Sequence, residues 1–252
     1  MNWNYVNTGF QSGQYNMDYD ESLAQTYNKT NEAILRFYGW SPYTVSIGFH
    51  QNIQDFNLQK LEQDGIGIVR RPTGGRAILH AHELTYSVVI PCNEQMPKQI
   101  YRLINEGLLL GLRTFGIDAK LSGKDENLPS FYKHPESVSC FAVSAKNEIQ
   151  YHGKKLAGSA QRRFGNVILQ HGSILLGAQH RDIIHYIAEH IREHHEIIEK
   201  SLVNNTTEAE TILNRSVSFE EIVPYIKQGF EEIFQISTLE EIHSADNHVL
   251  IS

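Results

Sequence analysis

Positive charge and glycine gather in two short segments of the chain. Residues 70–76 read RRPTGGR and residues 154–163 read KKLAGSAQRR, and together they hold seven of the 22 lysines and arginines. Neither segment contains an acid, although the net charge of the chain is −7. Glycine lets backbone N–H groups approach a ligand closely, and arginine binds carboxylate or phosphate through paired hydrogen bonds. Tight turns with solvated arginines are the alternative, but the two segments together favour a site for an anionic ligand.

A cysteine and a lysine form the second chemical feature. Cys140 lies in the segment SCF, fifteen residues before Lys155. A free thiol has a reference pKa of about 8.5, so it is mostly protonated at neutral pH, and a nearby cation favours the nucleophilic thiolate. Lys155 can supply that cation. The other cysteine, Cys92, follows Pro91 at a strand end and has no basic neighbour before Lys98, so we expect its role to be structural or incidental.

Histidine offers a third chemistry, because the chain has 13 of them. On a helix His190 and His194 lie one turn apart, a spacing that can chelate a metal, and His195 is adjacent. A zinc site normally needs three or four protein ligands, and the sequence offers no evident third. His194 also falls on an apolar stripe of the same helix. We therefore expect histidines with satisfied hydrogen bonds at the rim of the core, and no metal.

Length and composition exclude several classes of protein. At 252 residues, 40% of them hydrophobic, the chain is long enough for a sizeable core. Its acidity argues against a general nucleic-acid binder, which usually has a basic excess. The start MNWNYVNTGFQSGQ has neither the basic nor the apolar region of a secretory signal, and no apolar run approaches membrane-spanning length. We expect a cytoplasmic protein that binds neither nucleic acid nor membrane.

Apolar periodicity predicts the helices that must position these residues. Residues 98–117 carry apolar side chains at helical spacing and end near Gly116, and residues 16–28 read as a second helix with acids in its first turn. From Arg181 onward the chain reads as helical to its end.

Two details of this pattern make sharper predictions. Ser218 and Glu221 form a capping box ahead of an apolar stripe, but Pro224 fits poorly there and predicts a kink or a later helix start. Residues 120–137 form a long polar connector that we expect to be partly mobile.

Strands are predicted between these helices. Residues 83–91 alternate with the period of a strand, and residues 164–166 read as a hairpin turn between two more. Further strands are expected at 33–40, 43–49 and 66–72, the first two meeting at a Ser41–Pro42 turn and the last running into TGGRA. With no repeat or linker visible, we predict a single α+β domain over residues 1–252, with a mixed or antiparallel sheet flanked by helices.

Several ordered blocks resemble the lipoate–protein ligase and octanoyltransferase family, which is related to biotin–protein ligases. The blocks are RRPTGGRAILHAHELTYSV, GKKLAGSAQRR and VILQHGSILL, and the similarity extends to SGQYNMDYDESL, WSPYTVSIGFHQN and SVSFEEIVPYIKQGFEEIF. It covers nearly the whole chain. The resemblance implies a biotin/lipoate protein ligase-type α+β catalytic domain that binds a lipoyl or octanoyl group under the glycine–arginine loop, residues 70–76.

The resemblance also implies which residues bind the acyl substrate. They come from all three blocks and are Arg71, Gly74, Gly75, Arg76, His80, Gly158, Ser159, Gln161 and His171. One departure is visible, because an aspartate commonly follows the histidine at position 80 and this chain has Ala81. The roles of His82 and Glu83 are left open.

Within this family, three features favour the cysteine-dependent octanoyltransferase branch over ATP-dependent ligases. The chain is too short for the sizeable accessory domain that many ligases carry. The loop reads GGRA, whereas many ligases have a third glycine at position 76. Cys140 and Lys155 also have the order and spacing seen in cysteine octanoyltransferases.

The implied activity is octanoyl transfer in lipoate biosynthesis, from acyl carrier protein through a thioester on Cys140 to a lysine of a lipoyl-accepting protein. The glycine cleavage H protein is the expected acceptor, and a monomer is the default state. Exchange between thioesters is nearly balanced and amide formation is downhill, so no cofactor and no ATP are expected. The alternatives are an ATP-dependent lipoate–protein ligase and a non-catalytic protein that binds lipoylated domains. The intact Cys140 and Lys155 weigh against the second.

Overall fold

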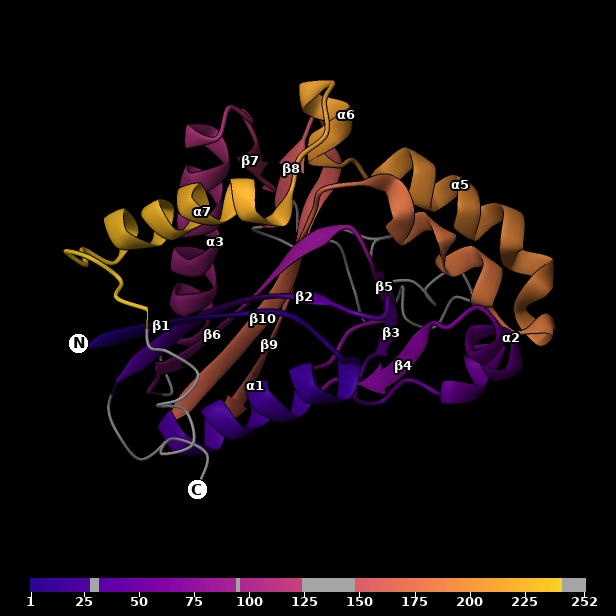
Figure 1. Cartoon of the computed structure of the whole chain (residues 1–252), viewed down its shortest axis with the longest axis horizontal. Helices are drawn as coiled ribbons and strands as arrows, with labels where there is room; N and C mark the ends of the chain where they lie inside the picture. The colour runs from indigo at the N-terminus through magenta and orange to yellow at the C-terminus, as the bar shows by residue number, and fades with distance from the viewer. Residues whose placement is uncertain (28–31, 94–95, 124–147, 242–252) are drawn as a thin grey trace.

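The computed structural model describes residues 1–27, 32–93, 96–123 and 148–241, with only the backbone at residues 192 and 193. Within these ranges the chain forms a mixed sheet of seven strands and a smaller sheet of three. Helices cover both faces of the large sheet (Figure 1). The predicted α+β class with a mixed sheet flanked by helices is confirmed, and the small sheet is an addition that the sequence patterns do not predict.

The large sheet has the strand order β1–β2–β6–β10–β9–β8–β7. β1 and β2 are parallel, and the remaining neighbours are antiparallel. The bounds are β1 Trp3–Gln11, β2 Ala33–Trp40, β6 Glu83–Pro91, β7 Lys120–Leu121, β8 Ile149–Tyr151, β9 Lys154–Phe164 and β10 Val167–Leu175. The predicted hairpin turn joins β9 to β10, with Gly165 at a φ of 54°.

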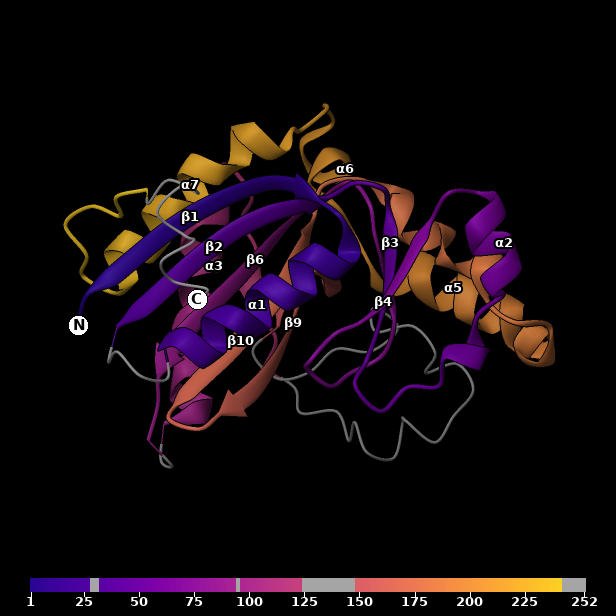
Figure 2. The ribbon, with the colours of Figure 1, turned by 60° about the horizontal axis from the view of Figure 1, so that its bottom comes forward.

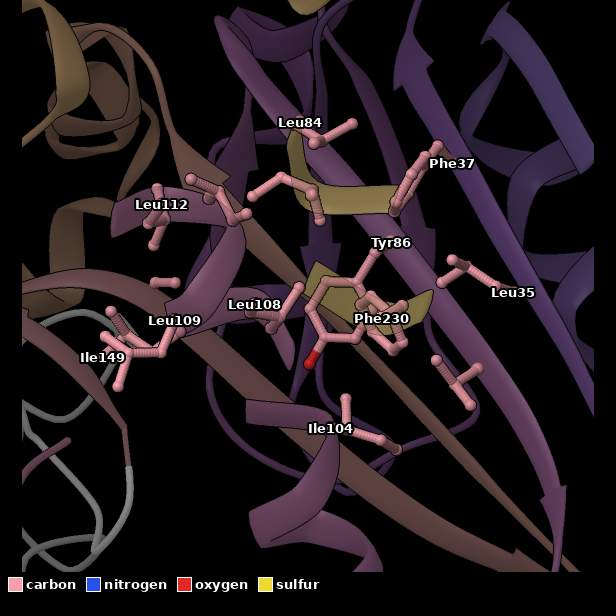
Figure 3. Packing of buried hydrophobic residues seen from close by; sticks show 14 of the residues in the cluster. Leu35, Phe37, Leu84, Tyr86, Ile104, Leu108, Leu109, Leu112, Ile149 and Phe230 are labelled. Atoms are coloured by element: carbon pink, nitrogen blue, oxygen red, sulfur yellow. The ribbon is translucent and has the colours of Figure 1, made fainter. Parts of the chain in front are cut away.

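Strand β6 is buried on both faces, so its alternation does not mark an exposed face. Tyr86 and its even-numbered neighbours pack with helices α3 (Pro97–Thr114) and α7 (Phe219–Ile233), as Figure 3 shows around Leu108 and Phe230. Val89 belongs to the opposite cluster, beneath α1 (Gly13–Tyr27). The large sheet is therefore the centre of the core, and the predicted helices 16–28 and 98–117 are confirmed within a few residues.

The small sheet lies beside the large one (Figure 2). Its strand order is β4–β3–β5. Its strands are β3 Thr44–Ile47, β4 Gly67–Arg70 and β5 Ile78–His80. β3 pairs in parallel with β4 and antiparallel with β5. The predicted strands 33–40 and 43–49 do meet at the Ser41–Pro42 turn, but they belong to different sheets. Helices α2 (Leu58–Gln63) and α5 (His195–Asn205) pack on its core.

From Arg181 to Ile233 the chain is largely helical, as predicted, although the first two helices of this part are of the 3₁₀ type. The helix does not continue through residues 234–241, and residues 242–252 lie outside the described ranges. The remaining elements are η1 Ile53–Asp55, η4 Ala178–Tyr186, η5 Glu189–His194 and α6 Ala209–Leu213. Ser218 caps α7 by accepting a hydrogen bond from the Glu221 N–H at 3.2 Å. Pro224 lies inside α7, which begins at Phe219, so the predicted later start is wrong.

The polar connector predicted at 120–137 begins as the short strand β7, and its residues from 124 onward lie outside the described ranges. None of the described helices combines the length and apolar character needed to span a bilayer.

Candidate functional site

A pocket opens where the large sheet meets the small one. It has an empty volume of about 430 Å³, part of it open to solvent. Elements α1, β2, β6, β9 and β10 line it from one side, and β3, β5 and the loop after β4 line it from the other. Five of the nine predicted substrate-binding residues line it, namely Arg71, His80, Gly158, Ser159 and His171. Its apolar walls come from Met17, Tyr38, Trp40, Ile78 and Ala160.

Arg71 braces the glycine–arginine loop from inside. Its guanidinium donates to the carbonyl oxygens of Ser46, Gly74 and Arg76 at distances of 2.6 to 3.1 Å, and the residue is buried. Arg76 itself is half-buried and does not line the pocket. The positive charge of Arg71 therefore shapes the loop as well as facing the pocket.

The two glycines of the loop have different reasons to be glycine. Gly75 has a φ of 90°, in the left-handed region that favours glycine. Its carbonyl also lies so close to Gly48 that a Cβ on Gly48 would be 1.9 Å from it, so Gly48 must be a glycine as well. A Cβ on Gly74 would meet no atom of the described residues within 4 Å. Gly75 is thus required by the fold, whereas Gly74 leaves room beside the loop.

The second basic segment meets this loop at Arg162. The Arg162 guanidinium donates to the Pro72 carbonyl at 2.7 Å and lies 4.5 Å from the centre of the Phe49 ring. Arg70 donates to three carbonyl oxygens of residues 48–51 at 2.8 to 2.9 Å. The predicted cluster of positive side chains is therefore present, but many of the hydrogen bonds that these arginines donate go to backbone carbonyls of the protein itself.

His171 connects the loop to a buried ion pair. Its Nδ1 lies 3.0 Å from Asp20 Oδ2, and its Nε2 lies 2.6 Å from the Thr73 hydroxyl. An ionised carboxylate only accepts, so Nδ1 carries the proton and Thr73 donates to Nε2. Burial lowers the pKa of His171, and the hydrogen bond and charge of Asp20 only partly oppose this. The ring is therefore neutral near pH 7.

Asp20 is held ionised by its other partners. Arg36 pairs with it at 2.8 Å, and both side chains are fully buried. Burial alone would raise the pKa of Asp20, but the charge of Arg36 and the hydrogen bonds from His171 and Ser87 outweigh it and lower the pKa. The network ties α1, β2, β6 and β10 together behind the pocket.

His80 has the same kinds of partner as His171. Its Nε2 lies 2.7 Å from the Ser46 hydroxyl, and its Nδ1 lies 2.7 Å from Glu83 Oε1. The ring stacks on Trp40 with centroids 3.9 Å apart. Two neighbouring hydroxyls also donate to Glu83 Oε1, whereas Glu83 Oε2 is buried without a hydrogen-bond partner among the described residues.

Glu83 is a site residue to which the sequence analysis gave no role. The acid that pairs with His80 stands three positions along the chain, at the start of β6, and not at Ala81. His82 lies elsewhere, with its Nε2 2.9 Å from the Val217 carbonyl. The sequence feature that could have revealed this pair is an acid three residues after a histidine, at the point where a strand begins.

Ser159 and Gln161 point away from the glycine–arginine loop, toward α3. Ser159 Oγ lies 2.6 Å from the Tyr86 hydroxyl, and Gln161 Nε2 donates to the Pro97 carbonyl at 3.3 Å. Gln161 does not line the pocket, and Gly158 does. A Cβ on Gly172 would lie 2.2 Å from the Gly158 carbonyl, so β9 and β10 approach closely at this wall.

Lys155 lies almost fully buried near the start of β9. Its Nζ is 2.8 Å from the Glu148 carboxylate, and its carbonyl accepts from the Thr207 N–H at 3.0 Å. Cys140, its predicted partner, lies outside the described residues. Sequence reasoning missed Glu148. The sequence feature that could have revealed Glu148 is the two-residue turn at 152–153. Both of its residues have positive φ, and the turn folds β8 onto β9.

The other candidates of the sequence behave differently. Cys92 is buried, burial raises the pKa of its thiol, and Sγ donates to the Asn93 carbonyl at 2.9 Å. A raised thiol pKa is the opposite of what a nucleophile needs. Over the described part of the chain, no group of three or more histidine, cysteine or acidic side chains is arranged to hold a metal ion, the segment with His190, His194 and His195 included.

A family model and two curated relatives agree on the family to which this chain is similar. The model of the lipoyl protein ligase A/B catalytic domain matches residues 12–231. The octanoyltransferase LipM of Bacillus subtilis (strain 168) is 37% identical over 241 residues, covering 91% of this chain and 85% of that protein. The octanoyltransferase LipM of Lysinibacillus sphaericus (strain C3-41) is also 37% identical over 241 residues, covering 93% and 87%.

Solved structures of lipoate protein ligases share the fold. A lipoate protein ligase from T. acidophilum with bound lipoic acid has a TM-score of 0.76 and 22% identity, covering 99% of this chain and 93% of that one. A bipartite lipoate protein ligase described with its E2 lipoyl domain, from Thermoplasma acidophilum, has a TM-score of 0.78 and 22% identity, covering 99% and 91%. At this identity the likeness concerns the fold alone.

Proposed function

Because this chain belongs to the lipoyl protein ligase A/B catalytic domain family and, like the relatives named above, is an octanoyltransferase, we propose that it transfers octanoyl through a thioester on Cys140. The donor is octanoyl-acyl carrier protein, and the acceptor is a lysine of a lipoyl-accepting protein, the glycine cleavage H protein first. The family and the enzyme class predicted from the sequence are confirmed. The cysteine mechanism, the acceptor and a cytoplasmic location are our proposals.

The observation that carries the mechanism is the place of Lys155 on strand β9. The same strand supplies Gly158 and Ala160 to the pocket wall, so the lysine stands three residues from the pocket. A buried ammonium is costly to maintain, and groups of this kind concentrate at functional sites. A cation here suits the activation of a thiol.

The chemistry proceeds in two balanced steps. The Cys140 thiolate attacks the donor carbonyl, a new C–S bond forms, and the C–S bond to the carrier breaks, releasing the carrier thiol once it takes up a proton. The neutral amine of the acceptor lysine then attacks the Cys140 thioester. A C–N bond forms, Cys140 leaves as thiolate, and the amine loses a proton. Dividing one acyl transfer in this way gives two easier steps.

The pocket supplies affinity for the acyl chain without polar recognition of its tail. Burying about seven CH₂ or CH₃ groups contributes about 5 kcal/mol, at about 0.8 kcal/mol for each. Met17, Tyr38 and Trp40 offer the apolar surface for such burial. The positive charges around the loop are left to orient the polar end of the donor.

Intact-mass analysis after incubation with octanoyl-acyl carrier protein tests this proposal. We expect one hydroxylamine-labile octanoyl adduct without ATP, none in Cys140→Ser, and normal loading in Cys92→Ser. Lys155→Ala should load more slowly at neutral pH, because the cation that favours the thiolate is gone. Strict dependence on ATP with free octanoate or lipoate would assign the chain to the ligase chemistry instead. Absence of both activities would favour a binding protein.

A further inference from the structure

Lys155 and its acid partner are each held by the backbone as well as by their ion pair. Nζ of Lys155 lies 2.8 Å from Glu148 Oε1, with side-chain exposures of 2% and 5%. The Lys155 carbonyl accepts from the Thr207 N–H at 3.0 Å, and the Glu148 carbonyl accepts from the Ser122 N–H at 2.7 Å. The pair is thus fixed between the α5–α6 connection on one side and the end of β7 on the other.

The strand register is irregular beside this pair. Gln150 of β8 pairs with Lys155 of β9, but Ile149 pairs with Ala157, so Leu156 is an extra residue in β9. A bulge of this kind bends a strand and re-aims its side chains, and bulges are common next to active sites. The hairpin therefore departs from regular pairing at the point where it brings an acid to Lys155.

We propose that Glu148 is a positioning residue for Lys155 in acyl transfer, an inference that builds on the cysteine mechanism proposed above. An ammonium without a counter-charge is poorly tolerated in a buried place, so the carboxylate allows Lys155 to remain charged there. The same contact fixes where the ammonium stands beside β8 and β9. Glu148 acts through the lysine and does not itself touch the substrate.

Single-turnover loading with octanoyl-acyl carrier protein tests the proposal. In Glu148→Gln the first-order loading constant at saturating donor should fall on the order of 10²-fold, because a displacement of about 1 Å at a reacting group has effects of that size. The donor concentration giving half-maximal loading should be unchanged. Glu148→Asp should recover part of the rate, since it restores the charge one methylene short.

A matched control separates this effect from the loss of any ion pair. Glu221→Gln removes the partner of Arg215 from a pair of the same 2.8 Å length on the surface of the molecule. Its loading rate should equal that of the unaltered protein. Thermal unfolding of each variant, followed by circular dichroism, shows which of them are folded.

The outcomes separate this inference from the proposed function. If the unaltered protein forms no adduct, the cysteine mechanism fails. If it loads and folded Glu148→Gln loads at the same rate, the positioning role is wrong. A faster rate also overturns it, because Glu148 would then compete with the thiolate for Lys155. Should Glu148→Gln not fold, full loading by Glu148→Asp overturns the role in the same way.

Discussion

His80 and His171 face one pocket with the same kinds of partner, but the acids that contact them differ in their own partners. In each ring Nδ1 lies against a carboxylate and Nε2 against a hydroxyl. Asp20, the acid of His171, is neutralised by the fully buried Arg36 at 2.8 Å. Glu83, the acid of His80, has no lysine or arginine partner within the described residues, and one of its oxygens has no hydrogen bond there.

The difference separates a structural centre from one that faces the pocket. The His171 centre links α1 and β2 to the glycine–arginine loop through Thr73, and its charges cancel within the protein. The His80 centre stacks on Trp40 at the pocket wall, and among the described residues its acid is paired with no lysine or arginine. We infer that the His171 centre fixes the glycine–arginine loop, whereas the His80 centre acts on the substrate bound in the pocket.

Asp20→Asn should produce the largest loss of stability. It leaves the Arg36 guanidinium buried without its counter-charge, and breaking a buried pair from one side typically costs about 3–5 kcal/mol. Urea unfolding at neutral pH measures the change. Asp64→Asn is the control, because Asp64 pairs with Lys60 in an exposed place, where a salt bridge contributes little to stability. Equal losses in the two variants would contradict the structural role of the His171 centre.

Glu83→Gln should cost less, about 1–3 kcal/mol, because it weakens hydrogen bonds without leaving a lysine or arginine unpaired. The amide keeps the shape of the side chain but offers a donor where Oε1 now accepts several hydrogen bonds. Transfer activity should fall by more than this stability loss explains at a temperature where the variant is folded. Steady-state transfer measured beside urea unfolding checks both. A loss of stability as large as that of Asp20→Asn would make the two centres equivalent.

Acidification should reduce stability through the His171 centre. Burial holds the pKa of His171 below the ordinary value of about 6.5, so below that pH the unfolded chain takes up a proton that the folded chain does not. This contribution is complete above about pH 6.5 and declines as the pH falls, by at most about 1.4 kcal/mol per pH unit. His180 adds a loss of the same sign, since burial lowers its pKa to about 4.

Urea unfolding at about pH 7, 6 and 5 measures this slope. In His180→Asn the slope between about pH 6.5 and 4 should be shallower than in the unaltered protein, and what is left includes the share of His171. Stability that is flat or rises on acidification would mean that His171 is charged in the folded state.

Local sequence patterns predicted where helices and strands lie better than they predicted which strands pair with one another. The apolar spacing of 98–117 and the turn at 164–166 are local, and both are confirmed. The sheet to which β3 belongs depends on its pairing with residues 67–70 and 78–80, which no local period records. The local cost of Pro224 argues against a helix that begins before it, yet α7 runs from Phe219 through Pro224, and its Ile222, Ile226 and Phe230 pack in the core.

The candidate site shows the same contrast between what local sequence predicts and what only the fold determines. The three blocks placed His80, His171, Arg71, Gly158 and Ser159 at one pocket, because their order along the chain carries the family pattern. The backbone carbonyls that receive the guanidinium of Arg71 could not be foreseen, since every residue has a carbonyl and only the fold selects some. Glu148 and Glu83 were missed because each meets its partner through a turn or strand start whose geometry sets the pairing.

Removing the hydroxyl from each histidine should produce the smallest effects and the sharpest distinction between the two centres. Thr73→Val deletes one buried hydrogen bond to Nε2 of His171, and Ser46→Ala deletes one to Nε2 of His80 together with the 3.1 Å hydrogen bond from Arg71, each worth about 1 kcal/mol. Thr73→Val frees the loop from His171, so it should raise the donor concentration at half-maximal rate and leave the maximal rate unchanged. Ser46→Ala leaves the loop braced, because Arg71 keeps the Ser46 carbonyl at 3.0 Å, and should lower the maximal rate instead. Initial-rate measurements over a range of donor concentrations separate the two outcomes. If both variants alter the same kinetic parameter by the same factor, the histidines form one functional unit, and the pairing of Asp20 but not Glu83 with an arginine has no consequence for transfer.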